Sequence, residues 1–295
     1  MDARIDVHLV DGTYELFRHH HALPSHRAGD MEVAAARGVA RSLAGLLEEG
    51  ATHVGVATDT VIESFRNAMY GGYKTGAGIE PDLLAQFPLL EELLEACGFV
   101  VWRMAEFEAD DALAAAAARS AADPRVRRVH IATPDKDLAQ CVRGDRVVQL
   151  DRRKGLIRTA DDVVDRFGVP PAAIPDYLAL VGDTADGYPG LPGWGAKSAA
   201  AVLARYGRLE DIPDDASTWD VRVRAAGTLG ATLAHARADA MLFRELARLR
   251  EDVPLMDDGV DGLRWRGPSP TLAEVAARVD APELADRLTR IARAD

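Results

Sequence analysis

Acidic side chains recur in this sequence where apolar runs end, and together they could bind metal ions. Strand-like runs at residues 5–10, 53–57 and 126–133 are each followed by aspartate. Two further acidic clusters open an alanine-rich segment and a turn-rich segment. The full set is Asp11, Asp59, Glu108, Asp110, Asp111, Asp135, Asp137, Asp183 and Asp186. Functional groups that follow parallel strands gather beyond one edge of the sheet, so we expect these carboxylates to converge.

Converging carboxylates repel one another in a partly buried site unless protons or cations neutralise them. Oxygen ligands select hard ions, so Mg²⁺, or Mn²⁺ in its place, is favoured over zinc. Two such ions roughly 3.5–4 Å apart activate the attacking water and stabilise the leaving oxygen in phosphoryl transfer. The acidic set therefore indicates phosphoryl-transfer chemistry with two Mg²⁺ ions.

Each cluster also has an ordinary structural explanation. An aspartate after a strand often caps the next helix, as Asp11 and Asp135 could do. Acids at residues 108–111 suit the positive end of a helix, and the acids at 135–137 and 183–186 suit turns. These explanations do not account for the joint placement of every cluster at a strand end or a turn, which favours a shared site.

The predicted elements place the acids on an α/β sheet. Val- and Ile-rich runs predict strands at residues 5–10, 53–57, 99–102, 126–133 and 147–150. Helical patterns lie between them at residues 31–49, 82–97 and 110–122. This alternation predicts a mostly parallel, three-layer sheet. After about residue 158 the strand signal ends, and helices are predicted at residues 161–167, 174–181, 197–206 and 224–250.

Composition bounds the partners and the compartment. The formal net charge of −12 argues, taken alone, against a nucleic-acid partner, because binding phosphates requires a basic face. Part of that acidity could belong to the metal site itself. Two cysteines are too few for a disulfide framework, and no segment resembles a signal peptide or a membrane span. We therefore expect a cytoplasmic protein with no membrane partner.

Five motifs, in order, resemble the bacterial 5′–3′ exonuclease and flap endonuclease family, whose members occur alone or fused to DNA polymerase I. The matching segments are residues 9–13, 65–66 with 73–74, 108–111, 133–138 and 180–197. The resemblance implies a PIN-like, Rossmann-like nuclease core at residues 1–158 with a helical arch around residues 63–90. A helical C-terminal region at residues 159–295 follows. It also implies a free-standing, monomeric enzyme that acts on DNA at 5′ ends, flaps and nicked or branched duplexes.

The family pattern implies two groups of metal ligands. One ion is expected among Asp11, Asp59, Glu108 and Asp110, and the other among Asp135, Asp137 and Asp186, with Asp111 and Asp183 in supporting roles. Asp11 and Asp135 are expected to be catalytic. Because all of these acids are present, the resemblance implies an active enzyme.

Two basic residues are expected to act on the substrate. Lys74 matches a lysine that in the family reaches the scissile phosphate from a mobile helical arch, where it can stabilise developing negative charge. Arg66 is expected to be catalytic as a second phosphate contact. The sequence departs from the family at Ala77, where arginine is usual, and at Gly187, where asparagine commonly follows the aspartate. Glycines at residues 71, 72, 76 and 78 should weaken any helix there by about 1 kcal/mol each.

Residues 192–198 resemble the helix–hairpin–helix turn of the family, which grips duplex DNA without reading its sequence, often through a bound K⁺. Glycine lets the backbone approach a phosphate closely, and the following helix N-terminus supplies N–H donors. We therefore expect Gly193, Gly195 and Lys197 to contact phosphates. An ordinary glycine turn is the alternative.

Other functions fit parts of the sequence. A phosphatase of the haloacid dehalogenase type would need an aspartate where Thr13 stands. A PIN-type ribonuclease shares the acidic sheet edge but usually lacks the helix–hairpin–helix turn. A catalytically silent, structure-selective DNA-binding protein is the non-enzyme alternative. We expect a metal-dependent 5′–3′ exonuclease or 5′-flap endonuclease that hydrolyses DNA phosphodiester bonds by a two-metal-ion mechanism.

Overall fold

The computed structural model describes residues 4–255 and 258–294 and divides into two compact units. Unit 1 contains the chain up to Ile62, the segment Gly76–Thr133 and the segment from Arg250 onward. Unit 2 contains Glu63–Thr75 and Pro134–Leu249. The units are interleaved in sequence, and a division of the chain at residue 158 stays a prediction.

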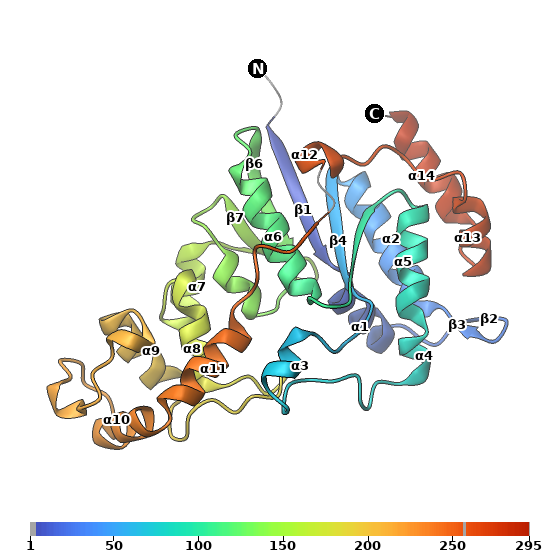
Figure 1. Cartoon of the computed structure of the whole chain (residues 1–295). Coiled ribbons are helices and arrows are strands. Elements are labelled where there is room, and N and C mark those ends of the chain that lie inside the picture. Colours follow the sequence, from blue (N-terminus) through green and yellow to red (C-terminus); the bar gives the residue numbers. More distant parts are fainter. Residues whose placement is uncertain (1–3, 256–257, 295) are drawn as a thin grey trace. The chain divides into compact units, whose positions relative to one another are not determined.

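Unit 1 is built on parallel strands, most of which can be followed in Figure 1. They are β1 (Ile5–Asp11), β4 (His53–Asp59), β5 (Val100–Met104) and β6 (Val126–Ala132). Their order is β5-β4-β1-β6. Asp11 pairs in register with Ala57, and Asp59 with Met104, so the carboxyl ends of these strands share one edge. The predicted parallel sheet is confirmed.

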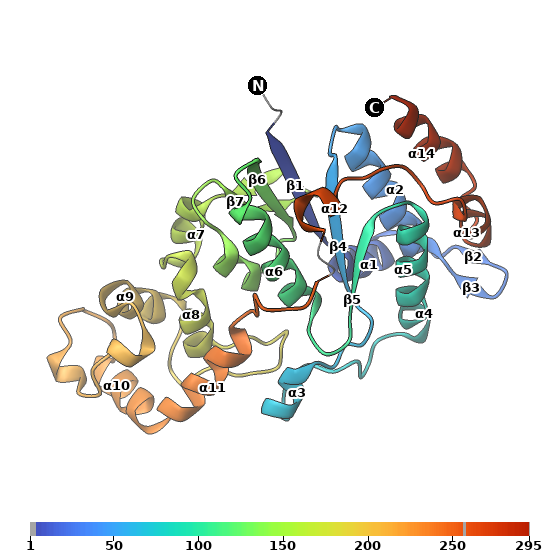
Figure 2. The same cartoon turned by 45° about the horizontal axis from the view of Figure 1, so that its top comes forward.

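Helices cover both faces of this sheet (Figure 2). The helix α6 (Ala109–Ala122) packs on one face, against β6, β1 and β4. The other face bears α1 (Gly12–Ala22), α2 (Ala34–Glu48) and α5 (Gln86–Ala96). The remaining elements of unit 1 are α4 (Pro81–Leu84), α12 (Gly259–Gly262), α13 (Leu272–Arg278), α14 (Glu283–Ala294) and the short hairpin β2 (Arg27–Ala28) and β3 (Met31–Glu32).

Alternation along the strands explains why both faces are covered. In β1, Val10 joins the core beneath α2 and α5, whereas Val7 and Leu9 point to the opposite face and are fully buried there. Strands with apolar residues on both faces need helices on both sides, which is the three-layer arrangement that the strand–helix alternation predicted.

Unit 2 is mainly helical. Its helices are α3 (Phe65–Met69), α7 (Ala160–Phe167), α8 (Ile174–Val181), α9 (Ala196–Tyr206), α10 (Ala226–His235) and α11 (Arg237–Ala247). Short 3₁₀ helices span Asp137–Cys141, Pro171–Ala173, Leu209–Asp211 and Ala216–Thr218. Two strands, β7 (Val147–Asp151) and β8 (Leu156–Arg158), form an antiparallel hairpin. Within the described residues no strand follows Arg158.

Two details differ from the sequence prediction. The helix predicted at residues 224–250 is broken at Ala236 into α10 and α11. Leu233 before the break and Ala240 after it are both fully buried in the same core, so the bend keeps two helix faces on one apolar cluster. The glycine-rich segment 70–80 contains no helix, in line with the weak helix propensity expected there.

Among the described residues, the helices are all too short or too polar to cross a membrane.

Candidate functional site

Unit 1 brings four of the predicted acids to the carboxyl edge of its sheet. Asp11 ends β1 and is buried, with 5% of its surface exposed. One carboxylate oxygen, Oδ1, accepts the Tyr14 N–H at 2.8 Å, and the other, Oδ2, accepts the Thr133 hydroxyl at 3.0 Å. Asp11 therefore caps α1 as the ordinary explanation supposed. An oxygen can accept a hydrogen bond and also bind a cation, so the cap does not exclude a ligand role.

The end of β4 is tied to the start of α6 by Asp59. Its Oδ1 accepts the Ala109 N–H at 2.7 Å, and its own N–H donates to the Thr13 hydroxyl at 2.8 Å. This bond places Asp59 beside the first turn of α6, which carries the buried Glu108 and the half-buried Asp110. In unit 1 the four carboxylates predicted for one ion thus stand at two strand ends and one helix start. Among the described residues, only Asp137, Asp183 and Asp186 bring three ligand oxygens within 4.8 Å of one another.

Asp111 has a structural role in the same unit. Its Oδ2 accepts the Glu108 N–H at 3.0 Å, which closes a capping box at the start of α6. Its Oδ1 accepts the Arg250 N–H at 2.9 Å. Asp111 is fully buried, so it fixes the backbone that presents Glu108 and Asp110.

Unit 2 contains a tighter cluster of carboxylates. Asp137, Asp183 and Asp186 are all buried. One carboxylate oxygen from each residue lies within 4.8 Å of the corresponding oxygens of the other two. Asp135 lies beside them and is exposed, and its Oδ1 accepts the Asp137 N–H at 2.9 Å. The Oδ1 of Asp137 is buried and has no hydrogen-bond partner among the described residues, although the Nζ of Lys136 lies 4.0 Å away. Buried oxygens at this spacing fit a hard divalent cation, which would supply the missing partner.

The electrostatics of this cluster favour an added positive charge. Burial, followed by the nearby Asp135, Asp186 and Asp183, raises the pKa of Asp137 well above its usual range, against the opposing effect of Lys136. Lys136 forms an ion pair with Asp183, and the Nζ of Lys74 lies 2.9 Å from Oδ1 of Asp186. Two lysines therefore partly compensate the negative charge that a cation would neutralise.

This arrangement predicts a stability change for Asp137→Asn. Because the folded state raises the pKa of Asp137, it binds the proton more tightly than the unfolded chain does. Stability of the metal-free protein should therefore fall as pH rises from the ordinary aspartate range through the raised pKa. At neutral pH in EDTA, the variant should gain roughly 1–3 kcal/mol in unfolding free energy and lose part of this pH dependence.

Urea unfolding with EDTA and with Mg²⁺, at acidic and neutral pH, measures this effect. Mg²⁺ should stabilise the wild type more than the variant, because the variant lacks one ligand. The exposed Asp239 gives a matched control, Asp239→Asn. This variant should change neither the unfolding free energy in EDTA nor the stabilisation by Mg²⁺. A variant less stable than wild type in EDTA at neutral pH would contradict the proposed repulsion.

Three functional candidates in this cluster were missed by the sequence reasoning. Lys136 pairs with Asp183, the Tyr73 hydroxyl donates to Oδ2 of Asp186 at 3.3 Å, and the buried Tyr188 hydroxyl has no hydrogen-bond partner. Burial and the nearby Asp137, Asp183 and Asp186 raise the pKa of Tyr188. A signal was available for Lys136, which stands between two predicted ligands in the sequence. No sequence signal distinguished Tyr188.

The departure at Gly187 has a structural explanation. Gly187 has a φ of +86°, and a Cβ there would collide with the carbonyl oxygen of Gly72. The Lys74 N–H donates to the backbone oxygen of Asp186 at 3.0 Å. Glycine at 187 therefore lets residues 72–74 pack against residues 186–187, and this contact holds the Lys74 side chain at the carboxylate of Asp186.

Arg66 is buried, with only 1% of its surface exposed. Its guanidinium donates from Nε to the Leu246 carbonyl at 2.8 Å and from Nη2 to the Arg248 carbonyl at 2.9 Å. These bonds satisfy carbonyls at the C-terminal end of α11. A phosphate contact would require Arg66 to leave them, and its predicted catalytic role stays a prediction.

The helix–hairpin–helix segment forms a turn between α8 and α9. Gly193 has a φ of +84°, a conformation that favours glycine, whereas Gly195 is extended and a Cβ there would meet nothing within 4 Å. Packing within the chain therefore does not require glycine at 195, which leaves room for close approach by a ligand. Lys197 is exposed in the first turn of α9.

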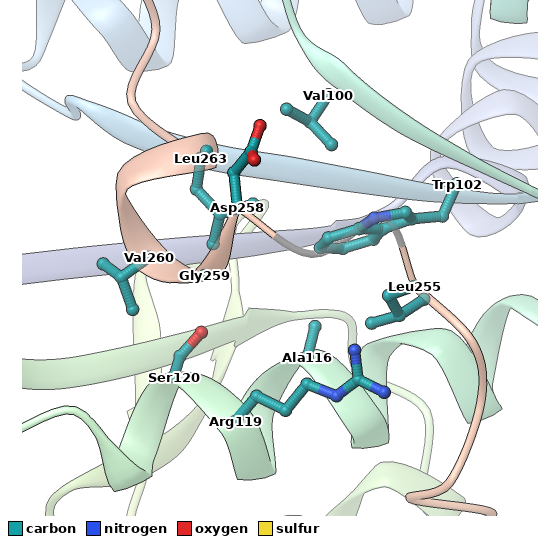
Figure 3. Close-up of a pocket in the computed structure, with 11 residues that line it drawn as sticks. Val100, Trp102, Ala116, Arg119, Ser120, Leu255, Asp258, Gly259, Val260 and Leu263 are labelled. Carbon is teal, nitrogen blue, oxygen red and sulfur yellow. The ribbon is translucent and has the colours of Figure 1, made fainter.

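Unit 1 also contains an apolar cavity of about 90 Å³ between β5, α6 and the segment around α12 (Figure 3). Its walls include Val100, Trp102, Ala116, Leu255, Val260 and Leu263. Its lining includes none of the predicted site residues. A mainly apolar wall does not suit a divalent cation, so this cavity is separate from the candidate metal ligands.

Two family models match nearly the whole chain. Residues 6–168 match the N-terminal resolvase-like domain of 5′-3′ exonucleases, and residues 169–271 match their C-terminal SAM fold. The chain is 36% identical to DNA polymerase I of Mycobacterium leprae over 257 residues, which are 84% of this chain and 27% of that protein. It is 35% identical to the thermostable DNA polymerase I of Thermus aquaticus over 254 residues, 85% of this chain and 29% of that protein.

The chain belongs to the 5′–3′ exonuclease and flap endonuclease family. It spans between a quarter and a third of the length of the DNA polymerases that it matches.

Solved structures share its fold. A mutant of the T5 5′-exonuclease superposes with a TM-score of 0.64 at 17% identity, covering 98% of this chain and 100% of that one. The catalytic core of Rad2 in complex with DNA substrate gives a TM-score of 0.63 at 16% identity, covering 98% and 93%. Another T5 5′-exonuclease structure holds divalent zinc ions. These likenesses confirm the fold class, a mostly parallel sheet followed by a helical region.

Proposed function

We propose that this chain is a Mg²⁺-dependent 5′–3′ exonuclease and 5′-flap endonuclease that hydrolyses phosphodiester bonds of DNA. The observation that carries the proposal is the buried cluster of Asp137, Asp183 and Asp186, whose oxygens lie within 4.8 Å in a chain of this nuclease family. Relatives of the same fold are described with DNA and with divalent metal ions, which supports both partners.

We propose two sets of metal ligands. Asp11, Asp59, Glu108 and Asp110 form one, and Asp135, Asp137 and Asp186 form the other, with Asp111 and Asp183 in support. When bound, two Mg²⁺ ions, or Mn²⁺ in their place, would supply an activated water and stabilise the leaving oxygen. The hydrogen bonds of Asp11, Asp59 and Asp111 fix these carboxylates before substrate arrives, so little reorganisation is required.

Lys74 is proposed to act on the scissile phosphate. In the described structure its Nζ compensates Asp186 at 2.9 Å. A cation bound to the same carboxylate would take over that compensation and leave the ammonium group to pair with a phosphate oxygen. Asp11 and Asp135 are proposed to be catalytic as metal ligands. Arg66 is proposed as a second phosphate contact, and its hydrogen bonds to the carbonyls of residues 246 and 248 support the segment that carries Lys74.

The turn before α9 is proposed to grip duplex DNA. Gly193, Gly195 and Lys197 would contact phosphates without reading base sequence. The turn would hold a K⁺ ion, whose charge would favour a phosphate there. We propose that the protein acts as a monomer on 5′ ends, flaps and nicked or branched duplexes.

Lys197→Ala tests the grip separately from the chemistry. The variant should bind a nicked duplex several-fold more weakly. The slope of log affinity against log salt should become shallower by about 1, because one phosphate contact is lost. Single-turnover cleavage at saturating enzyme should remain close to that of wild type. A large loss of the single-turnover rate with unchanged binding would contradict this assignment, because it would show that Lys197 acts in catalysis.

A substrate panel tests the function itself. Labelled 5′-flap, nicked, blunt and RNA-primed duplexes would be incubated with Mg²⁺, Mn²⁺ or EDTA, and products sized from the 5′ end. Cleavage of flap and nicked DNA with metal, and none with EDTA, is expected. Cleavage of RNA alone would favour a PIN-type ribonuclease, and metal-independent binding without cleavage would favour a silent DNA-binding protein.

A further inference from the structure

Basic residues concentrate in one part of this acidic chain. Residues 143–166, which contain β7, β8 and α7, include the basic residues Arg143, Arg146, Arg152, Arg153, Lys154, Arg158 and Arg166. The acids of this segment are Asp145, Asp151, Asp161, Asp162 and Asp165. The chain as a whole has a formal net charge of −12. A local basic surface of this kind is the usual footprint of a phosphate-containing partner.

Arg158 ends β8, directly opposite Gln149 in the antiparallel pair. Its Nη1 is buried and has no hydrogen-bond partner among the described residues. Hydrogen bonds from Thr159, and to a lesser extent the positive charge of Arg158, lower the pKa of the nearby Asp162. One oxygen of that carboxylate already accepts the Thr159 N–H at 2.7 Å and the Thr159 hydroxyl at 2.8 Å. Burying an N–H without an acceptor is unfavourable, and a bound phosphate oxygen would supply an acceptor for this one.

Arg166 lies in the last turn of α7 with its guanidinium over the Phe167 ring, 4.7 Å from the centroid. Partial desolvation and the neighbouring Arg158 lower its pKa, while Asp135 and Tyr177 act in the opposite direction. The two guanidinium groups therefore share one neighbourhood, which reaches the metal-ligand candidate Asp135. Within residues 4–255 and 258–294, neither arginine forms an ion pair with a carboxylate.

Neighbouring cations repel each other, and a phosphate bound to both would offset this repulsion further than the nearby Asp135 does. Guanidinium groups suit phosphate in particular, because their parallel N–H donors match two of its oxygens. Stacking on Phe167 holds one of these groups in place in advance of binding.

We propose that Arg158 and Arg166 form a phosphate-binding pair that holds a backbone phosphate of the nucleic-acid strand on the Asp135 side of unit 2. This inference rests on the proposed nuclease function and names a contact outside the turn before α9. The pair would fix the strand relative to the ligands of one metal ion. A backbone phosphate, rather than a terminal one, is the proposed ligand.

The double variant Arg158→Gln/Arg166→Gln tests the pair by flap-DNA binding in Ca²⁺ across a salt series. Affinity at moderate salt should fall about tenfold or more, and the slope of log affinity against log salt should flatten by roughly 1.5–2, as two phosphate contacts are lost. The matched control is Arg143→Gln/Arg153→Gln, two exposed arginines of the same region, which should change the slope less. The variant Arg158→Lys/Arg166→Lys should keep most of the slope, and thermal unfolding checks that each variant folds.

Three outcomes would overturn the pair. The first is an unchanged slope in the folded double variant, and the second is an equal loss in the control, which would indicate a diffuse basic surface. The third is a loss confined to 5′-phosphorylated DNA, which would indicate a terminal-phosphate site. Cleavage of flap DNA by the wild type is measured in parallel with Mg²⁺. If the wild type cleaves but the double variant binds DNA as the wild type does, only this inference is refuted and the proposed nuclease function stands.

Discussion

Asp186→Ala should slow single-turnover cleavage of a 5′-flap DNA by roughly 10³-fold or more, while leaving flap binding within a few-fold of wild type. Removing one preorganised group in such a site already costs about 10²–10³-fold in rate. Asp186 contributes more than one interaction. It belongs to the cluster with Asp137 and Asp183, and it also receives Lys74 at 2.9 Å and the Tyr73 hydroxyl at 3.3 Å.

Rapid-quench kinetics at saturating enzyme give the rate, and fluorescence anisotropy in Ca²⁺ gives the affinity. The exposed Asp211 provides the matched variant, Asp211→Ala, which should cleave at the wild-type rate. Partial recovery by Asp186→Ala at high Mn²⁺ would agree with a weakened metal site. Cleavage by Asp186→Ala within tenfold of wild type would remove this aspartate from the metal ligands.

Lys74→Ala should lower the cleavage rate of bound flap DNA by roughly 10²-fold, with a smaller effect on affinity. The lysine is placed by a backbone contact, in which its N–H donates to the Asp186 oxygen at 3.0 Å. Its ammonium group lies at the carboxylate cluster and not on the outer surface. Its loss should therefore remove stabilisation of developing phosphate charge more than it removes attraction to the duplex.

The same kinetic and binding assays separate these effects. Lys154→Ala, which removes an exposed lysine from the turn of the β7–β8 hairpin, is the matched control and should retain the wild-type rate. Lys74→Arg should recover part of the rate, because it keeps the charge with a different shape. A Lys74→Ala enzyme that loses affinity in proportion to rate would show that this lysine only binds DNA.

Much of the fold followed from periodicity in the sequence. The strand predicted at residues 53–57 is β4, and the helix predicted at residues 174–181 has those bounds in the structure. Buried parallel strands are continuous apolar runs, which makes them visible without tertiary information. The break at Ala236 was not visible, because the segment has no glycine or proline there and the bend is imposed by packing against the core of unit 2.

The candidate site was predictable in its residue types and less so in its contacts. Acids at strand ends were expected to converge, and Asp137, Asp183 and Asp186 do lie together. The contact between Gly187 and Gly72 could not be predicted, since it joins two loops that are remote in sequence. The hydrogen bonds from Arg66 to carbonyls at the end of α11 could not be predicted either, and its contact with a phosphate stays a prediction.

The acidic net charge of the chain is compatible with a nucleic-acid partner. A net charge of −12 argued against a nucleic-acid partner, yet several of these acids are buried ligand candidates and not a repulsive surface. Seven of the 35 lysines and arginines lie within residues 143–166, around the β7–β8 hairpin and α7. Net charge is a sum over the chain, whereas a phosphate responds mainly to charges within about a Debye length, about 10 Å at 0.1 M salt.

Anomalous diffraction from crystals grown with Mn²⁺ tests the central claim most directly, because it locates the ions without reference to activity. We expect one peak within about 2.3 Å of carboxylate oxygens of Asp137, Asp183 or Asp186, and a second against Asp11, Glu108 or Asp110. Both peaks should vanish in EDTA. Fully loaded crystals with no peak at either group, or with manganese bound only elsewhere on the protein, would contradict the assignment of these acids as metal ligands.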